Sequence, residues 1–266
     1  MVNKSKKSKF SFVKKILGKS AFSRSIYYSS TNISKRLQYE YEWRIFKKMQ
    51  SKKRGLAILS SDKQPALHDR TKTTQFDTHY IYHPAWAARI LKKINPNEHI
   101  DIASTLAFSS IISAFIPIKF YDLRPAHLNL SGLESTSANI TKLPMADNSV
   151  VSLSCMHTIE HIGLGRYGDA LDPDGDLKAI LELRRIVKPG GSLLFVVPIT
   201  GRSRVCFNAH RIYSYEQILS YFPDFSLKEF SLIPDDALES GMIYNATTKD
   251  ANKQNYGCGC FWFVKN

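Results

Sequence analysis

Short apolar runs alternate with longer amphipathic stretches through the last two thirds of the chain. The run at 192–197 is almost continuously apolar, as in a strand covered on both faces of a parallel sheet. Shorter runs are bounded by polar and turn residues, which also indicates strands. The strands predicted in this way lie at 99–103, 116–121, 150–155, 192–197, 226–233 and 257–265.

Helical spacing appears between several of these runs. Trp86, Ile90 and Ile94 share one face of a predicted helix, and Pro84 fits its first turn. Ser214 is suited to cap another helix. The remaining helices are predicted at 105–114, 177–187 and 214–222. Strands that alternate with helices and end in two consecutive strands predict a doubly wound α/β sheet.

The charge is concentrated in one part of the chain. The formal net charge is +14, and residues 1–54 contain sixteen Lys or Arg but only two acids. The remaining residues are balanced, so the basic pI reflects an N-terminal extension and not a basic catalytic face. We therefore expect an extension at 1–70, partly disordered or helical, and a folded domain at 71–266.

Residues 1–20 combine lysines with Phe10, Phe12, Val13, Ile16 and Leu17 in a short, imperfect amphipathic pattern. This pattern is compatible with peripheral contact with an anionic membrane surface. A loose basic arm with no specific partner is the alternative. A nucleic-acid partner is not expected, because no nucleic-acid-reading motif accompanies the arm. A charged helix is expected at 35–54.

The composition is that of a globular protein, with 43% hydrophobic residues. No apolar run approaches the ~20 residues that span a bilayer, and the N-terminus lacks the apolar core of a signal peptide. The chain contains only four cysteines, too few for a disulfide framework. These features predict a cytoplasmic protein with reduced thiols.

Polar residues follow three of the predicted strands. Asp101 and Asp122 stand at the carboxyl ends of the first two, and a polar segment follows Cys155. In a doubly wound sheet, ligands bind beyond these carboxyl ends. The sequence therefore predicts a binding site at this edge of the sheet.

The segment from Phe76 to Val264, about seven-tenths of the chain, resembles class I S-adenosylmethionine-dependent methyltransferases. More narrowly, it is similar to a bacterial family of unknown function whose members are often encoded among surface-polysaccharide genes. The stretches that carry the resemblance are His99–Thr105, Tyr121–Pro125, Leu143–Ser149, Ser152–Asp169, Arg185–Leu194 and Cys206–Arg211. The resemblance implies a Rossmann-like, mostly parallel seven-stranded sheet, S-adenosylmethionine as cofactor, and methyl transfer to a small-molecule or glycan acceptor.

The resemblance also implies a set of cofactor-binding residues. Ala103 stands where most relatives carry the first glycine of a loop that approaches the cofactor closely. Asp122 is suited to accept both ribose hydroxyls, the alternative being an ion pair with Arg124. Asn139 stands where relatives often have an acid near the adenine. The full set is Asp101, Ala103, Ser104, Asp122, Asn139 and Ile140.

Histidines supply the candidate bases. Glu160 and His161 resemble the Glu-His pair of small-molecule methyltransferases, although a packed, hydrogen-bonded His161 is the alternative. His210 is a second candidate base, and His157 lies four residues before His161. The catalytic candidates are thus His157, Glu160, His161 and His210. Arg166, Tyr167 and Arg211 are the candidate acceptor-binding residues.

No metal site is expected. The alternating Asp172, Asp174 and Asp176 resemble a calcium loop, but Leu183 stands where the bidentate acid is needed. Helix capping by Asp174 or Asp176 is favoured instead. Cys258 and Cys260 share one face of a predicted strand, and packing is their expected role.

Two other functions remain open at this stage. The degenerate first loop and the basic tail are also compatible with a non-catalytic scaffold of the same fold in glycan assembly. RNA methylation that uses the basic arm is a weaker alternative, and it predicts steep salt dependence.

Overall fold

The computed structural model describes residues 21–50 and 55–266, and it divides into two compact units, Met1–Gln75 and Phe76–Asn266. The lysine-rich and amphipathic segment at 1–20 lies outside the described residues. Within the described part of the chain, no helix is both long enough and apolar enough to cross a membrane.

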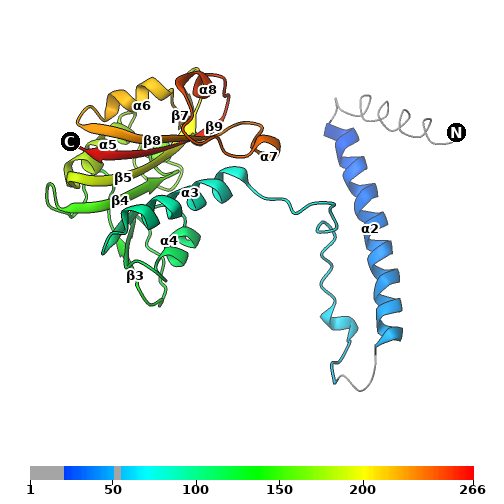
Figure 1. The fold of residues 1–266 in the computed structure, drawn as a ribbon. Coiled ribbons are helices and arrows are strands. Elements are labelled where there is room, and N and C mark those ends of the chain that lie inside the picture. Colours follow the sequence, from blue (N-terminus) through cyan, green and yellow to red (C-terminus); the bar gives the residue numbers. More distant parts are fainter. Residues whose placement is uncertain (1–20, 51–54) are drawn as a thin grey trace. The chain divides into compact units, whose positions relative to one another are not determined.

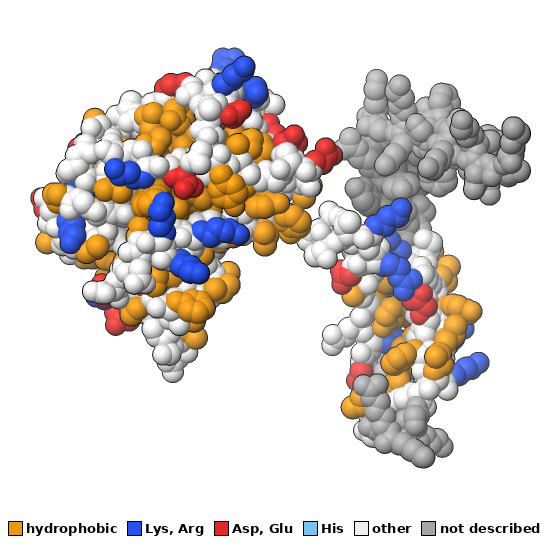
Figure 2. Space-filling view, in the orientation of Figure 1, with side chains coloured by type: hydrophobic (Ala, Val, Ile, Leu, Met, Phe, Trp, Pro, Cys, Tyr) orange, Lys and Arg blue, Asp and Glu red, His pale blue; other side chains and the backbone are white. Residues whose placement is uncertain are grey.

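The first unit consists of helix α2 (Ala21–Met49) and a following segment that contains the 3-10 turn η3 (Ser60–Asp62). The helix begins earlier and ends earlier than the predicted 35–54. The following segment is tied to α2 by polar contacts. Lys63 pairs with Glu40 at 2.6 Å and lies 4.0 Å from the centre of the Trp43 ring. Apolar side chains nevertheless remain exposed along this unit (Figure 2).

The second unit is built on a seven-stranded sheet in the order β3-β2-β1-β4-β5-β9-β8 (Figure 1). Only β9 runs antiparallel to its neighbours. The sheet strands are β1 (His99–Ile102), β2 (Ile118–Asp122), β3 (Leu133–Ser137), β4 (Val150–Met156), β5 (Val187–Ile199), β8 (Phe225–Ile233) and β9 (Gly257–Lys265). The predicted mostly parallel, doubly wound α/β sheet is confirmed.

Helices cover both faces of this sheet (Figure 1). One face packs against α3 (Thr78–Ile94) and α4 (Leu106–Ile112), with Trp86 and Phe108 in that core. The other face packs against α5 (Gly175–Ile186) and α6 (Tyr215–Tyr221), which contribute Leu183 and Ile218. The smaller elements are η4 (Ile159–His161), the hairpin β6 (Arg204–Cys206) and β7 (His210–Ile212), α7 (Ala237–Ser240) and α8 (Thr248–Asn252).

Three local predictions were wrong. The edge strand β3 was not predicted, because Leu133 is its one buried residue and no apolar alternation marks it. Helix α3 begins at Thr78 and not at Pro84, because the Asp77 carboxylate accepts the Tyr80 N–H and caps the helix. Asp174 precedes α5 but its side chain makes no capping hydrogen bond. Ser214 does cap α6, as predicted.

Candidate active site

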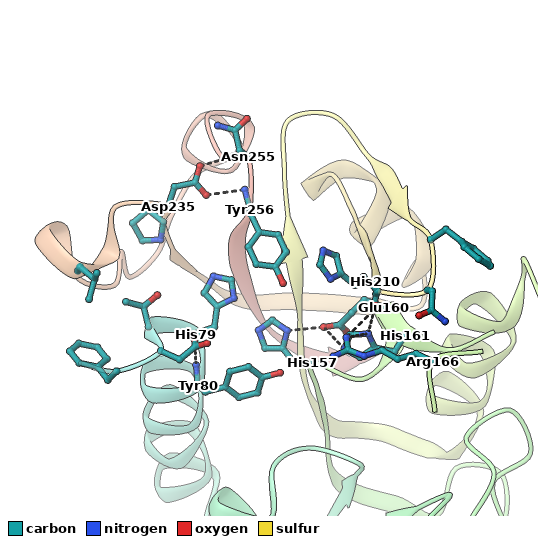
Figure 3. Close-up of a pocket in the computed structure, with 18 residues that line it drawn as sticks. His79, Tyr80, His157, Glu160, His161, Arg166, His210, Asp235, Asn255 and Tyr256 are labelled. Atoms are coloured by element: carbon teal, nitrogen blue, oxygen red, sulfur yellow. Dashed lines mark hydrogen bonds and ion pairs between the residues drawn. The ribbon is translucent and has the colours of Figure 1, made fainter. Parts of the chain in front are cut away.

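Two cavities lie beyond the carboxyl ends of the central strands. The first, here called the sheet-edge cavity, has a volume of about 520 Å³. Its walls come from the ends of β1, β2, β3 and β4 and from the loop at 163–175. The second, the histidine cavity, has a volume of about 1030 Å³ and is drawn in Figure 3. His157 and His161 line both cavities and so form their shared wall.

Asp122 ends β2 and lines the sheet-edge cavity. Its Oδ1 accepts the backbone N–H of Arg124 at 2.8 Å, and no partner for Oδ2 is found among the described residues. The Arg124 guanidinium lies 4.8 Å from the centre of the Tyr167 ring and forms no ion pair with Asp122 in the described part of the chain. One carboxylate oxygen is therefore left for a ligand.

The loop after β1 is fixed by hydrogen bonds to the buried Asp101. Ala103 adopts a φ of 52°, a left-handed conformation that favours glycine, and it lines the sheet-edge cavity. Asp101 is completely buried and accepts hydrogen bonds from Ser104, Ser109 and Ser154 at 2.5–2.6 Å. Burial raises the pKa of Asp101 to about 6, against the lowering effect of these hydroxyls. Asp101 orients the loop and does not reach the cavity.

Asn139 and Ile140 form another part of the same wall. The Asn139 Oδ1 accepts both the N–H and the hydroxyl of Thr141, at 3.0 and 2.9 Å, which fixes the turn after β3. Ile140 is buried and presents an apolar surface. This part of the cavity suits a flat, mostly apolar ring.

The glycine-rich loop at 163–175 closes the sheet-edge cavity as an ordered wall. A side chain at Gly163 would overlap the Asp172 carbonyl oxygen, and Gly163 also has a positive φ of 78°. The Asp169 carboxylate accepts the backbone N–H groups of Gly163 at 2.7 Å and of Tyr167 at 3.2 Å. These contacts fix the conformation of the loop.

Glu160 lies between two histidines beside the histidine cavity (Figure 3). Its side chain is 1% exposed, and Oε1 is 2.7 Å from Nδ1 of His157 and 3.8 Å from Nε2 of His161. Among the described residues, its Oε2 has no hydrogen-bond partner. The Nδ1 of His161 lies 2.6 Å from the Ala209 carbonyl oxygen. A proton on that Nδ1 leaves Nε2 as the acceptor.

Burial is the main cause of the pKa shifts of the residues that line the histidine cavity. Burial, together with the nearby His157, lowers the pKa of His79 to about 4. The pKa of His210 is lowered by burial and by the neighbouring His161. Burial raises the pKa values of Tyr80 and Tyr256 to about 12. At neutral pH, His79 and His210 are thus neutral, and both tyrosines keep their protons.

A family model described as "Caenorhabditis protein of unknown function, DUF268" matches residues 144–238. No curated protein matches the chain. Among solved structures, the Burkholderia thailandensis 1,6-didemethyltoxoflavin-N1-methyltransferase with bound S-adenosylhomocysteine is similar at 10% identity and a TM-score of 0.48. That match covers 70% of this chain and 79% of the other.

Two further solved structures are similar at the same level. A Haloferax volcanii protein bound to the methyltransferase activator Trm112 has 17% identity and a TM-score of 0.46, covering 71% and 90% of the two chains. A TehB-like S-adenosylmethionine-dependent methyltransferase from Corynebacterium glutamicum has 12% identity and a TM-score of 0.44, covering 70% and 89%. Likeness at this level concerns the fold and carries no information on substrate.

Most of the residues singled out from the sequence come together around the two cavities. Ala103, Asp122, Asn139, Ile140 and Tyr167 line the sheet-edge cavity. Glu160, Arg166 and His210 line the histidine cavity, and His157 and His161 line both. Asp101 and Ser104 lie beneath the first loop and line neither cavity.

Arg211 is not an acceptor clamp in this structure. Its side chain is buried and donates to the Ile162 carbonyl at 2.6 Å and the Pro173 carbonyl at 3.0 Å, and it lies 3.5 Å from the Asp176 carboxylate. Its donors are directed at the protein and not at a cavity. Arg211 therefore braces the loops that carry the shared wall.

The part of the histidine cavity formed by His79, Tyr80 and Tyr256 was not predicted from the sequence. His79 and Tyr80 stand in the first turn of α3, a turn that was not predicted. The available signal was Asp77, a good N-cap residue followed by helical spacing. Tyr256 directly precedes β9, and no local pattern connects that position with α3.

Proposed function

We propose that the chain is an S-adenosylmethionine-dependent methyltransferase whose acceptor is a small or sugar-linked molecule. The observation that carries the proposal is the shared wall. A cavity that ends at Asp122 and a wider, histidine-rich cavity meet at His157 and His161. Methyl transfer needs two ligands in line across such a junction.

The residues of the sheet-edge cavity fit the cofactor. Its volume lies within the usual range of small-molecule sites, roughly 300–1,000 Å³. Asp122 offers a carboxylate oxygen to the ribose hydroxyls, the backbone at Ala103 allows close approach, and Ile140 packs against the adenine. When bound, S-adenosylmethionine supplies a methyl group already activated on a sulfonium.

The histidine cavity suits the acceptor. Tyr256 and Phe207 expose aromatic faces on its wall, and Arg166 and Asp235 add charged groups. Apolar faces with a few convergent polar groups are typical of small-molecule sites. A sugar presents both kinds of surface, which favours a sugar-linked acceptor. An association with surface polysaccharide rests on the resemblance noted in the sequence. A cytoplasmic location rests on the small number of cysteines, and contact of residues 1–20 with an anionic membrane rests on their lysines and interspersed apolar residues.

His161 is our candidate for the base that removes the acceptor's proton. The Ala209 carbonyl holds Nδ1–H, so Nε2 is the accepting nitrogen. A proton taken up there would lie close to Glu160, whose Oε1 is 3.8 Å from Nε2, and the carboxylate would stabilise the imidazolium. His210, whose ring is 6.4 Å from that of His161, is the second candidate.

Calorimetry with S-adenosylhomocysteine tests the proposal. We expect saturable binding by the wild type and roughly 10- to 100-fold weaker binding by Asp122→Asn, because charge-assisted hydrogen bonds to the ribose are lost. Asp174→Asn is the matched control, since this exposed acid makes no capping bond and lines neither cavity. A folded wild-type protein that does not bind would contradict the proposal and favour the non-catalytic scaffold.

A further inference from the structure

Three potential metal ligands meet beside the histidine cavity, and the methyl-transfer proposal gives none of them a step in the chemistry. His79 from the first turn of α3, His157 after β4 and Cys258 near the start of β9 form what we call the His-His-Cys cluster. Their ligand atoms all lie within 4.8 Å of one another. The Cys258 Sγ is 3.3 Å from Nε2 of His157, and the His79 and His157 rings are stacked with centroids 5.3 Å apart.

The hydrogen bond to Glu160 orients the His157 ring as a metal ligand would be oriented. Because Nδ1 of His157 is bonded to Glu160 at 2.7 Å, its Nε2 is left to face Cys258. In many metal centres a carboxylate accepts a hydrogen bond from the ring nitrogen of the histidine that does not bind the metal. This contact fixes the orientation of the ring and makes the ligating nitrogen more basic. His157 also holds a φ of 55°, a strained conformation for a residue with a side chain.

Unsatisfied polar atoms surround the cluster. Among the described residues, the buried Oε2 of Glu160 and the buried Nε2 of His83 have no hydrogen-bond partner. The His83 ring lies 5.1 Å from the His157 ring, one helical turn after His79. A buried carboxylate with an unpartnered oxygen is costly unless a cation compensates its charge. A divalent cation with a thiolate and this carboxylate would be neutral overall.

We propose that His79, His157 and Cys258 bind Zn²⁺ and leave its fourth position open to the histidine cavity. Two imidazoles and one thiolate are a donor set that zinc favours, and three protein ligands with one open position characterise catalytic zinc sites. His79 and His157 line the cavity, so the open position faces the space for the acceptor. No metal site was expected from the sequence, which gave Cys258 a packing role only. Zinc binding at these three residues does not depend on methyl transfer.

Cobalt substitution of the full chain, produced without a histidine tag, tests the site. After chelation, the wild type is expected to bind one equivalent of Co²⁺ with a thiolate-to-cobalt charge-transfer band, and Zn²⁺ should displace it. Cys258→Ser should lose the band. Cys260→Ser is the matched control, because Cys260 is equally buried two residues along β9 and should keep the band.

Two more variants keep the test decisive. Glu160→Gln should bind Zn²⁺ roughly 10- to 100-fold more weakly, as expected for a carboxylate behind a ligating histidine. His79→Ala, at a partly exposed position, replaces Cys258→Ser if the latter does not fold. A wild type without stoichiometric metal, or equal bands in the Cys258 and Cys260 variants, would show only a thiol–imidazole hydrogen bond and overturn the proposal. Metal content is measured without cofactor, so its outcome is independent of the calorimetry with S-adenosylhomocysteine.

Discussion

The two cavities that meet at His157 and His161 are built in different ways. The sheet-edge cavity is assembled at one edge of the sheet from strand ends and a glycine loop, and backbone hydrogen bonds and Asp169 hold it in shape. The histidine cavity gathers side chains from the start of α3, the turn after β4, the segment at 207–210 and the residues before β9.

This difference matches two different chemical tasks. A ligand that carries its own activated group needs a rigid binding site that positions it. An acceptor that must lose a proton needs a base whose pKa is adjusted by its surroundings, as burial and the neighbouring His161 adjust that of His210. The comparison predicts that substitutions on the two sides affect different kinetic constants.

The largest effect is expected at the shared wall. His161→Ala should lower kcat roughly 10²- to 10⁴-fold, the usual contribution of a general base, with a much smaller change in the affinity for S-adenosylhomocysteine. The measurement is steady-state kinetics beside calorimetry. His127→Ala, an exposed histidine outside both cavities, is the control. An unchanged kcat in His161→Ala would remove this residue from the chemistry.

A substitution of Arg211 tests whether this side chain stabilises the loops of the shared wall or binds the acceptor. Arg211→Met should lower the free energy of unfolding by roughly 3 kcal/mol, because Asp176 and two loop carbonyls lose a buried partner. Urea unfolding measures this loss. A variant of unchanged stability with a raised KM for the acceptor alone would instead show the clamp predicted from the sequence.

His99 lines neither cavity, so its titration affects the stability of the fold and not the chemistry of the histidine cavity. It is the first residue of β1, its buried ring is hydrogen-bonded to Ser152 and Ser154 of β4, and burial lowers its pKa from 6.5 to about 3. Above pH 6.5 neither state binds its proton. As the pH falls from 6.5 toward 3, only the unfolded chain binds it, so stability falls by about 1.4 kcal/mol per pH unit.

His99→Gln should remove this contribution and flatten the dependence of the unfolding free energy on pH by that amount. Urea titrations of both proteins at neutral pH and near pH 5 give the two slopes. Equal slopes would mean that His99 is not held neutral in the folded protein.

The contrast between the cavities also explains what the sequence could predict. Buried strands are apolar runs, so six of the seven strands of the sheet could be predicted, and Asp122 could be placed because it ends such a run. The edge strand β3 lacked that pattern. The histidine cavity depends on His79 and Tyr256, which are brought together only by tertiary packing, and no local spacing predicts that contact.

The most direct test of this account is a crystal structure of the protein with S-adenosylhomocysteine. We expect the ribose on Asp122, the adenine against Ile140, and the sulfur directed toward the wall formed by His157 and His161. A ligand that lies wholly in the histidine cavity, or that turns its sulfur away from that wall, would contradict the assignment of the two cavities.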